Sequence, residues 1–138
     1  DIEQVSNLLN KRSGMIGLTG FSDMRDIRRK IAEGDGQAKL AYDMYAYRIK
    51  KYIGAYAAAL NGLDAVIFTA GVGENDPIIR ELVCRDMGYL GLELDADKNN
   101  IRSDGIKEIS KSGSRVKILV IPTHEELEIA NQCYNLLK

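Results

Sequence analysis

Two glycines, spaced two residues apart, follow a short apolar segment. Residues 65–70 read AVIFTA, and the chain continues with Gly71, Val72, Gly73, Glu74 and Asn75. Glycine has no Cβ atom, so the backbone can turn sharply there and approach a ligand closely. A helix beginning at Pro77 would direct free N–H groups to the same region, which suits a nucleotide phosphate. The simpler alternative is a tight turn from strand to helix, because the third glycine of the dinucleotide fingerprint and the Gly-Lys-Ser/Thr of a P-loop are missing.

A second candidate site follows the glycine-rich residues 14–22. Asp23 is a plausible N-cap, since its carboxylate can accept hydrogen bonds from the next helical turn. Met24 would begin that helix, and Arg25 could present its guanidinium to a ligand. The alternative is a capped helix whose arginine is merely solvated.

A carboxylate, Glu125, follows the second strong apolar segment, residues 116–121. Thr123 and Glu126 have the spacing of a capping box, which places Glu125 at the second position of a helix. A carboxylate there could hold Mg²⁺ beside phosphates, or it could only offset the helix dipole. Because ligands gather at the carboxyl ends of strands in parallel or mixed α/β sheets, residues 71–75 and 123–126 are expected to share a cleft.

Other reactive groups do not form a recognisable site. The single histidine, His124, has no serine or cysteine placed to act as a nucleophile. Cys84 and Cys133 fall in expected helices without a Cys-x-x-Cys motif, which indicates two buried thiols in a cytoplasmic protein. The net charge of -1 argues against nucleic-acid or anionic-membrane binding, and the apolar run at 53–60 is shorter than the ~20 residues needed to cross a bilayer.

The expected elements alternate as in an α/β domain, and 138 residues suffice for one such domain. The strands expected are 65–70, apolar on both faces as in a central strand, and 116–121, with weaker ones at 89–94 and 106–109. Loops are expected at 14–22, 71–75 and 95–105. Helices are expected at 2–9, 24–33, 37–60 and 77–87, with a last one ending near 137. One face of the long helix should carry Leu40, Ala41, Met44, Tyr45, Ile49, Ile53, Tyr56, Ala57 and Leu60.

Four segments together resemble the acetate kinase family. They read LTGFSDMRD at 18–26, YRIKKYIGAY at 47–56, FTAGVGEN at 68–75 and VIPTHEEL at 120–127. Their order matches the carboxy-terminal part of that family over essentially the whole chain. The resemblance implies an actin-like (ribonuclease H-like) fold with a mixed sheet flanked by helices, and a reaction that interconverts acetate and ATP with acetyl phosphate and ADP.

The same resemblance implies particular roles for residues of this chain. Asp23, Met24 and Arg25 would line the adenosine side of an ATP site, residues 71–75 would wrap the nucleotide with backbone, and Glu125 would help to bind Mg²⁺. Two positions depart from the family pattern: the loop before Asp23 is one residue shorter than in many relatives, and His124 replaces the usual asparagine. The full-length protein would be a cytoplasmic homodimer.

The chain also begins without Met, basic stretch or apolar signal core, so it is expected to be a piece of a longer protein. In the family, the amino-terminal lobe and the residues that position the carboxylate and the transferring phosphoryl group precede this segment. No catalytic residue is therefore assigned here, and the chain alone is expected to be inactive. Propionate kinase and a non-catalytic actin-like nucleotide-binding or dimerisation module are the alternatives.

Overall fold

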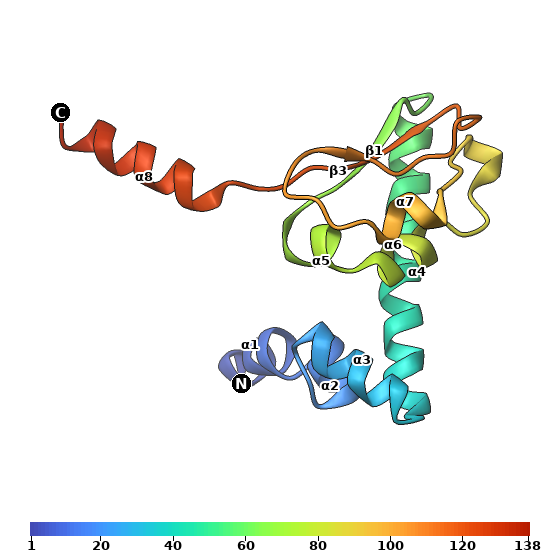
Figure 1. Cartoon of the computed structure of the whole chain (residues 1–138). Helices are drawn as coiled ribbons and strands as arrows, with labels where there is room; N and C mark the ends of the chain where they lie inside the picture. Colours follow the sequence, from blue (N-terminus) through green and yellow to red (C-terminus); the bar gives the residue numbers. More distant parts are fainter. The chain divides into compact units, whose positions relative to one another are not determined.

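A computed structural model describes residues 1–138, which form two compact units (Figure 1). The first unit contains Asp1–Gly62 and Ile78–Arg85, and the second contains Leu63–Pro77 and Asp86–Lys138. The first is helical and the second is built on a sheet. The expected α/β class with a mixed sheet is thus confirmed.

Five helices make up the first unit: α1 (Ile2–Lys11), α2 (Gly14–Thr19), α3 (Met24–Ala32), α4 (Gly36–Ala59) and most of α6 (Pro77–Cys84). The loop expected at 14–22 is wrong, because α2 occupies most of it. Gly20 ends α2 with φ of 78°, a left-handed conformation that glycine adopts without strain. Local glycine content had favoured a loop, but glycines can also end and begin short helices.

The long helix α4 has the expected length, and its buried face agrees only in part with the prediction, because Ala41 and Ala57 are buried as expected. Its buried residues are small, except for one tyrosine: Ala38, Ala41, Tyr42, Ala46 and Ala57. Larger apolar residues predicted for that face, including Leu40, Met44 and Leu60, are exposed. Alanines permit close approach of helices α2 and α3, which pack on α4. A small-residue stripe rather than the large apolar side chains therefore defines the packed face.

The two cysteines lie in different environments. Cys84 is buried at the end of α6, and burial raises the pKa of its thiol to about 12. Cys133 is exposed. The expectation of two buried thiols is therefore wrong for Cys133.

The second unit holds a three-stranded sheet in the order β1-β3-β2. Strands β1 (Ala65–Phe68) and β3 (Lys117–Val120) are parallel, and β2 (Lys107–Glu108) is antiparallel to β3. Val66, Phe68, Ile118 and Val120 are buried by the alternation of side chains along β1 and β3. In this chain β1 is an edge strand with Ile67 53% exposed, so the prediction of a central strand that is buried on both faces is wrong.

The segment between α6 and β2 also differs from expectation. A 3-10 turn, η1 (Gly88–Leu90), replaces most of the strand expected at 89–94, of which only isolated bridges at Leu92 and Leu94 remain. Helix α7 (Ala96–Asn100) lies in the expected loop and is capped by the Asp95 side chain. Asn99 is buried and donates a hydrogen bond to the carbonyl of Pro77 at 2.9 Å. Short polar helices such as α7 have no apolar periodicity by which to recognise them.

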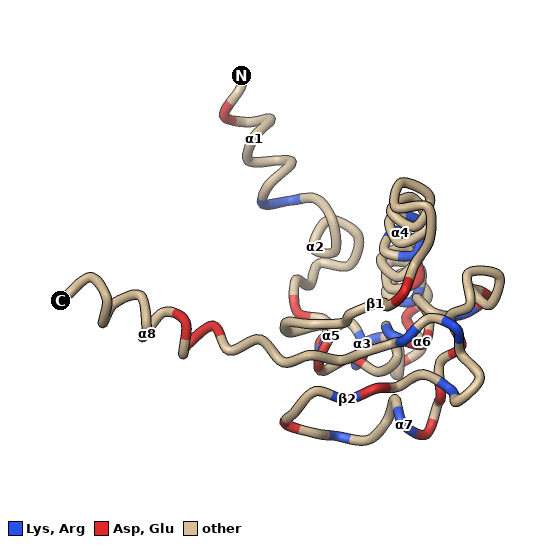
Figure 2. Tube along the Cα trace, turned by 90° about the horizontal axis from the view of Figure 1, so that it is seen from above, with Lys and Arg blue, Asp and Glu red and all other residues tan.

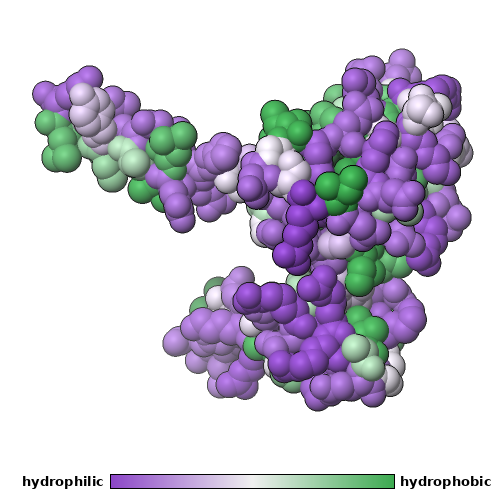
Figure 3. Space-filling model, viewed as in Figure 1, coloured by the Kyte–Doolittle hydropathy of each residue, from purple (hydrophilic) through white to green (hydrophobic).

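The last helix, α8 (Glu125–Leu136), buries none of its residues. Apolar side chains are visible along it in the space-filling view (Figure 3), and the exposed ones include Leu127, Ile129 and Leu136. No helix in the structure has both the length and the apolar character required to cross a membrane.

Candidate functional site

The two strands that precede the candidate residues end at the same edge of the sheet. Phe68 pairs with Val120 in parallel register, and the N–H of Ile121 donates to the carbonyl of Phe68 at 3.0 Å. Parallel strands place their carboxyl ends together, and ligands of α/β sheets bind at such ends. The structure therefore brings residues 71–75 and Thr123 to one edge of the second unit, and the cleft expected between 71–75 and 123–126 stays a prediction.

Residues 71–75 are helical, not a loop. They belong to α5 (Ala70–Asn75), and the side chain of Asn75 donates to the carbonyl of Gly71 at 2.9 Å. The turn from β1 into this helix is made by Ala70, whose φ of 57° is a left-handed conformation. Such a conformation costs a residue with a Cβ roughly 1–2 kcal/mol. The glycines had suggested the sharp turn at 71 or 73, but the strained residue is the alanine before them.

The two glycines of α5 have different surroundings. A Cβ at Gly71 would meet no atom within 4 Å, so this face of the helix start is open. A Cβ at Gly73 would lie 3.1 Å from the carbonyl carbon of Phe68. Gly73 therefore permits α5 to pack against the end of β1, while Gly71 is the glycine at which a ligand could approach the backbone.

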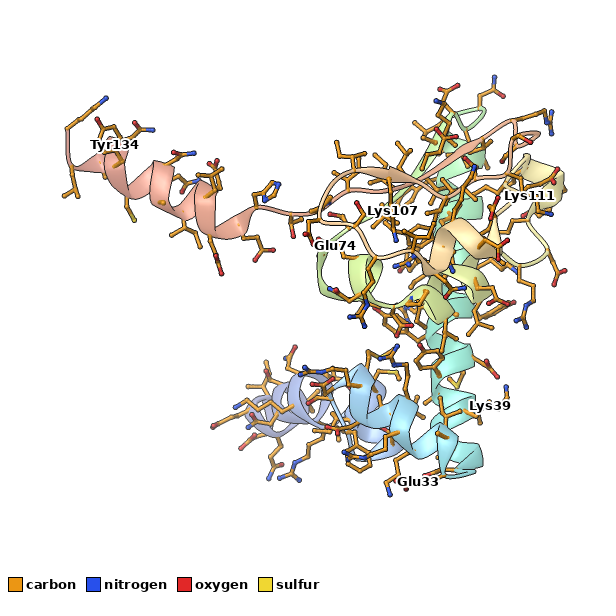
Figure 4. All side chains as sticks on the ribbon, in the orientation of Figure 1. Glu33, Lys39, Glu74, Lys107, Lys111 and Tyr134 are labelled. Atoms are coloured by element: carbon orange, nitrogen blue, oxygen red, sulfur yellow. The ribbon has the colours of Figure 1, made fainter.

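The Glu74 side chain connects α5 to the segment after β3. Its Oε1 atom accepts hydrogen bonds from the backbone N–H and the hydroxyl of Thr123, at 2.9 and 3.0 Å. Glu74 is labelled in Figure 4. These donors, above all the backbone N–H, lower the pKa of Glu74 below its usual range. The predicted capping box is wrong, because Thr123 bonds to Glu74 and His124 is the N-cap, with no side-chain cap bond.

Glu125 is the first residue of α8 rather than the second. Glu126 and Glu128 share its helical turn, and the acidic start of α8 is visible in Figure 2. Nowhere do three or more His, Cys, Asp or Glu side chains gather in a way that could hold a metal ion. One carboxylate matches the chemistry of Mg²⁺, which keeps several waters and takes one or two carboxylates together with substrate phosphates. A single carboxylate at this helix start, Glu125 or Glu126, therefore fits a metal that arrives with a nucleotide.

The third group of candidate residues begins α3 in the first unit. Asp23 is the N-cap, as predicted, and accepts from the N–H of Arg25 at 2.8 Å. The Arg25 guanidinium also folds back on the same carboxylate, with Nη2 2.6 Å from Oδ2. These bonds lower the pKa of Asp23 to about 2 and raise that of Arg25. Met24 is the first residue of α3 and is partly exposed.

Comparison with known proteins decides the family. Residues 1–131 match the model of the acetokinase family. The chain belongs to that family. An acetate kinase of Flavobacterium johnsoniae is 58% identical to this chain over 136 residues, which cover 99% of the chain and 34% of that protein.

Solved structures confirm the fold of this chain. The crystal structure of Porphyromonas gingivalis acetate kinase matches with a TM-score of 0.90 at 45% identity, covering 100% of this chain and 35% of that one. A propionate kinase from Francisella tularensis matches with a TM-score of 0.83 at 38% identity, covering 94% and 33%. The chain thus spans about a third of the length of these relatives.

Two structural contacts near the candidate site were not predicted. The bond between Glu74 and Thr123 joins residues 49 positions apart, and the contact between Gly73 and Phe68 depends on how α5 meets the strand. The local spacing of Thr123 and Glu126 pointed to a capping box instead. Only a pairing of the two strands in three dimensions identifies the true partner of Thr123.

Proposed function

We propose that this chain is the nucleotide-binding part of an enzyme that transfers a phosphoryl group between ATP and acetate. The match of residues 1–131 to the acetokinase family is the observation that best supports this function. The shared edge at the ends of β1 and β3 supplies a place where backbone and a carboxylate can meet a metal-bound triphosphate.

Each candidate residue has a defined role in this proposal. Gly71 and its neighbours Val72, Gly73, Glu74 and Asn75 line the nucleotide with backbone, and closest approach is at the open face of Gly71. Glu125 contacts Mg²⁺ directly or through water, and the metal neutralises phosphate charge during transfer. Asp23, Met24 and Arg25 contact the adenosine side. In this contact Nε and Nη2 of Arg25 pair with Asp23, and Nη1 is the part of the guanidinium proposed to donate to the ligand.

We expect the chain by itself to bind nucleotide without turning it over. Phosphoryl transfer needs groups that align and stabilise both reactants, and no residue here is assigned to acetate or to the transferring group. Calorimetric titration with Mg-ATP tests binding, and formation of acetyl phosphate in the presence of acetate tests turnover. Robust acetyl phosphate formation by residues 1–138 alone would contradict this expectation.

Acetate is the proposed substrate, and propionate is the second candidate because a propionate kinase shares the fold at a TM-score of 0.83. The decisive experiment uses the longer enzyme that we infer contains this chain. The ratio of kcat/KM for acetate and propionate with saturating Mg-ATP separates the two functions. Activity with neither acid would instead favour a non-catalytic nucleotide-binding module.

Two carboxylates at the start of α8 provide a matched test of the metal role. Glu125→Gln should raise the Mg²⁺ concentration required for half-maximal activity much more than Glu126→Gln, because only Glu125 is proposed to face the metal. Equal effects of the two substitutions would show that the acidic helix start acts only through its general charge.

The proposed enzyme is a cytoplasmic homodimer. Exposed apolar residues on α4, which include Tyr47, Tyr52 and Tyr56, are consistent with an interface of that kind. Sedimentation of the longer enzyme tests the oligomeric state, and a monomer at micromolar concentration would refute it.

A further inference from the structure

The Glu74 carboxylate accepts hydrogen bonds from a residue outside its own helix. Its Oε1 atom accepts both hydrogen-bond donors that Thr123 offers, the backbone N–H and the hydroxyl, at 2.9 and 3.0 Å. Hydrogen bonds to an ionised carboxylate are roughly twice as strong as those between neutral groups. The contact therefore holds Thr123 in position more firmly than one neutral bond would.

Glu74 lies on a helix whose position on the sheet is fixed. The helix that carries it, α5, packs against β1 at Gly73, where there is no room for a Cβ beside Phe68 without displacing the strand. Asn75 closes the end of α5 by bonding back to Gly71. The Glu74 side chain therefore extends from the end of a helix whose position on the sheet is determined by close backbone packing.

Thr123 in turn lies only two residues before Glu125. Two residues of extended chain span at most about 7 Å, and Pro122 restricts the backbone on the other side of Thr123. Beyond Thr123, α8 buries none of its side chains. The bond to Glu74 is therefore the last side-chain anchor that the structure shows before the Glu125 carboxylate.

We propose that Glu74 is a positioning residue that sets the location of Glu125 relative to the glycine face of α5. This inference rests on the proposed function, in which Glu125 contacts the metal of Mg-ATP. It assigns the Glu74 side chain to Thr123 rather than to the nucleotide. A second unpaired carboxylate beside the triphosphate would repel it, whereas one that already accepts two hydrogen bonds has its charge partly offset.

Kinetic variants of the longer enzyme test the positioning role. Thr123→Val removes the hydroxyl but keeps the shape, Thr123→Ser keeps the hydroxyl, and Glu74→Gln removes the charge. We expect Thr123→Val and Glu74→Gln to raise the Mg²⁺ requirement about tenfold, as substitutions behind a metal ligand commonly do. The KM for acetate should stay within about twofold, and Thr123→Ser should behave as the wild type.

The double variant Glu74→Gln/Thr123→Val tests whether the two residues act through one shared contact or independently of each other. If both residues act through the same contact, the double variant should be no worse than the poorer single variant. Multiplied losses, an equal loss in Thr123→Ser, or an acetate KM that rises as much as the Mg²⁺ requirement would overturn the proposal.

A direct measurement of the contact separates failure of this inference from failure of the proposed function. In the 138-residue chain, Glu74→Gln should move the Thr123 amide proton resonance upfield, because a weaker acceptor replaces the carboxylate. Glu81→Gln is the control, since Glu81, on α6, pairs with Arg85 and its substitution should leave that resonance unchanged. An unmoved Thr123 resonance refutes the positioning contact, whereas a moved one in an enzyme inactive with acetate and propionate refutes only the proposed function.

Discussion

The backbone of Gly73 lies against the backbone of Phe68, so that a Cβ at position 73 would be 3.1 Å from the Phe68 carbonyl carbon and 3.4 Å from its Cα. This contact joins the end of β1 to the helix that follows it. The neighbouring glycine, Gly71, faces open space. The two glycines of one short helix therefore have different reasons to lack a side chain.

Alanine substitutions should separate these reasons. Gly71→Ala should stabilise the chain by about 0.5 kcal/mol, because alanine lowers the entropy of the unfolded chain and its methyl group meets no atom. Gly73→Ala should destabilise it by roughly 1–3 kcal/mol, since the Phe68 backbone must shift. Urea unfolding of both variants measures the two changes. Equal effects would show that the contact with Phe68 does not limit position 73.

Ala70 should be a site where glycine is preferred. Its φ of 57° costs roughly 1–2 kcal/mol, and glycine removes that strain at an entropic cost of about 0.5–1 kcal/mol. We expect Ala70→Gly to raise the free energy of unfolding by about 0.5 kcal/mol. Ala58→Gly, within α4, is the control and should lower it by about 1 kcal/mol. A loss of stability in Ala70→Gly would mean that the left-handed turn is not retained.

Asp23 should contribute stability that depends on pH. Hydrogen bonds from Arg25 hold its folded pKa at about 2, below the unfolded value of about 3.9. A depressed carboxylate pKa stabilises the fold above the unfolded pKa, and this contribution is lost as pH falls through about 2. Asp23→Asn keeps a capping oxygen but loses the ion pair. The difference in Tm between wild type and variant should therefore be present at pH 7 and vanish near pH 2; a constant difference would rule out the ion pair as its cause.

The two thiols should react at very different rates. Cys133 is exposed, whereas the Cys84 thiol is buried and its pKa is raised to about 12. Only the thiolate is nucleophilic, so a disulfide reagent at pH 8 should modify a single cysteine in the folded chain and both cysteines in denaturant. Cys133→Ser should abolish the fast reaction, and Cys84→Ser should leave it unchanged. Fast labelling in Cys133→Ser would place Cys84 in contact with solvent.

Much of the fold follows from short-range pattern in the sequence. Helical spacing identified α1, α3 and α4, and two apolar runs identified β1 and β3. Asp23 was recognised as a cap because the capping bond spans only two residues. Patterns of this kind depend only on residues close together in the sequence, so they can be recognised without knowledge of the tertiary structure.

The errors arise where distant segments meet. Which side chains of α4 are buried depends on its partners: Ala38 and Ala46, which were not predicted, are buried, whereas Leu40 and Met44 are exposed. Thr123 bonds to Glu74 because β1 and β3 are parallel neighbours, a fact that no spacing near Thr123 encodes. The binding roles that the resemblance gives to the candidate residues stay predictions, and the helical form of 71–75 required coordinates.

The parallel pairing of β1 with β3 also constrains the order of folding. Phe68 and Val120 are neighbours in the sheet although about 50 residues separate them. The segment between them must close into a loop, at a cost in conformational entropy, before the two strands can pair. During synthesis on a ribosome, β1 emerges well before β3, so its backbone hydrogen-bonding groups at first have no strand to pair with. Helices α3 and α4 can already pack against each other at that stage. Contacts of such long range fold slowly, so the edge at which we place the nucleotide is expected to be among the last parts of the chain to form.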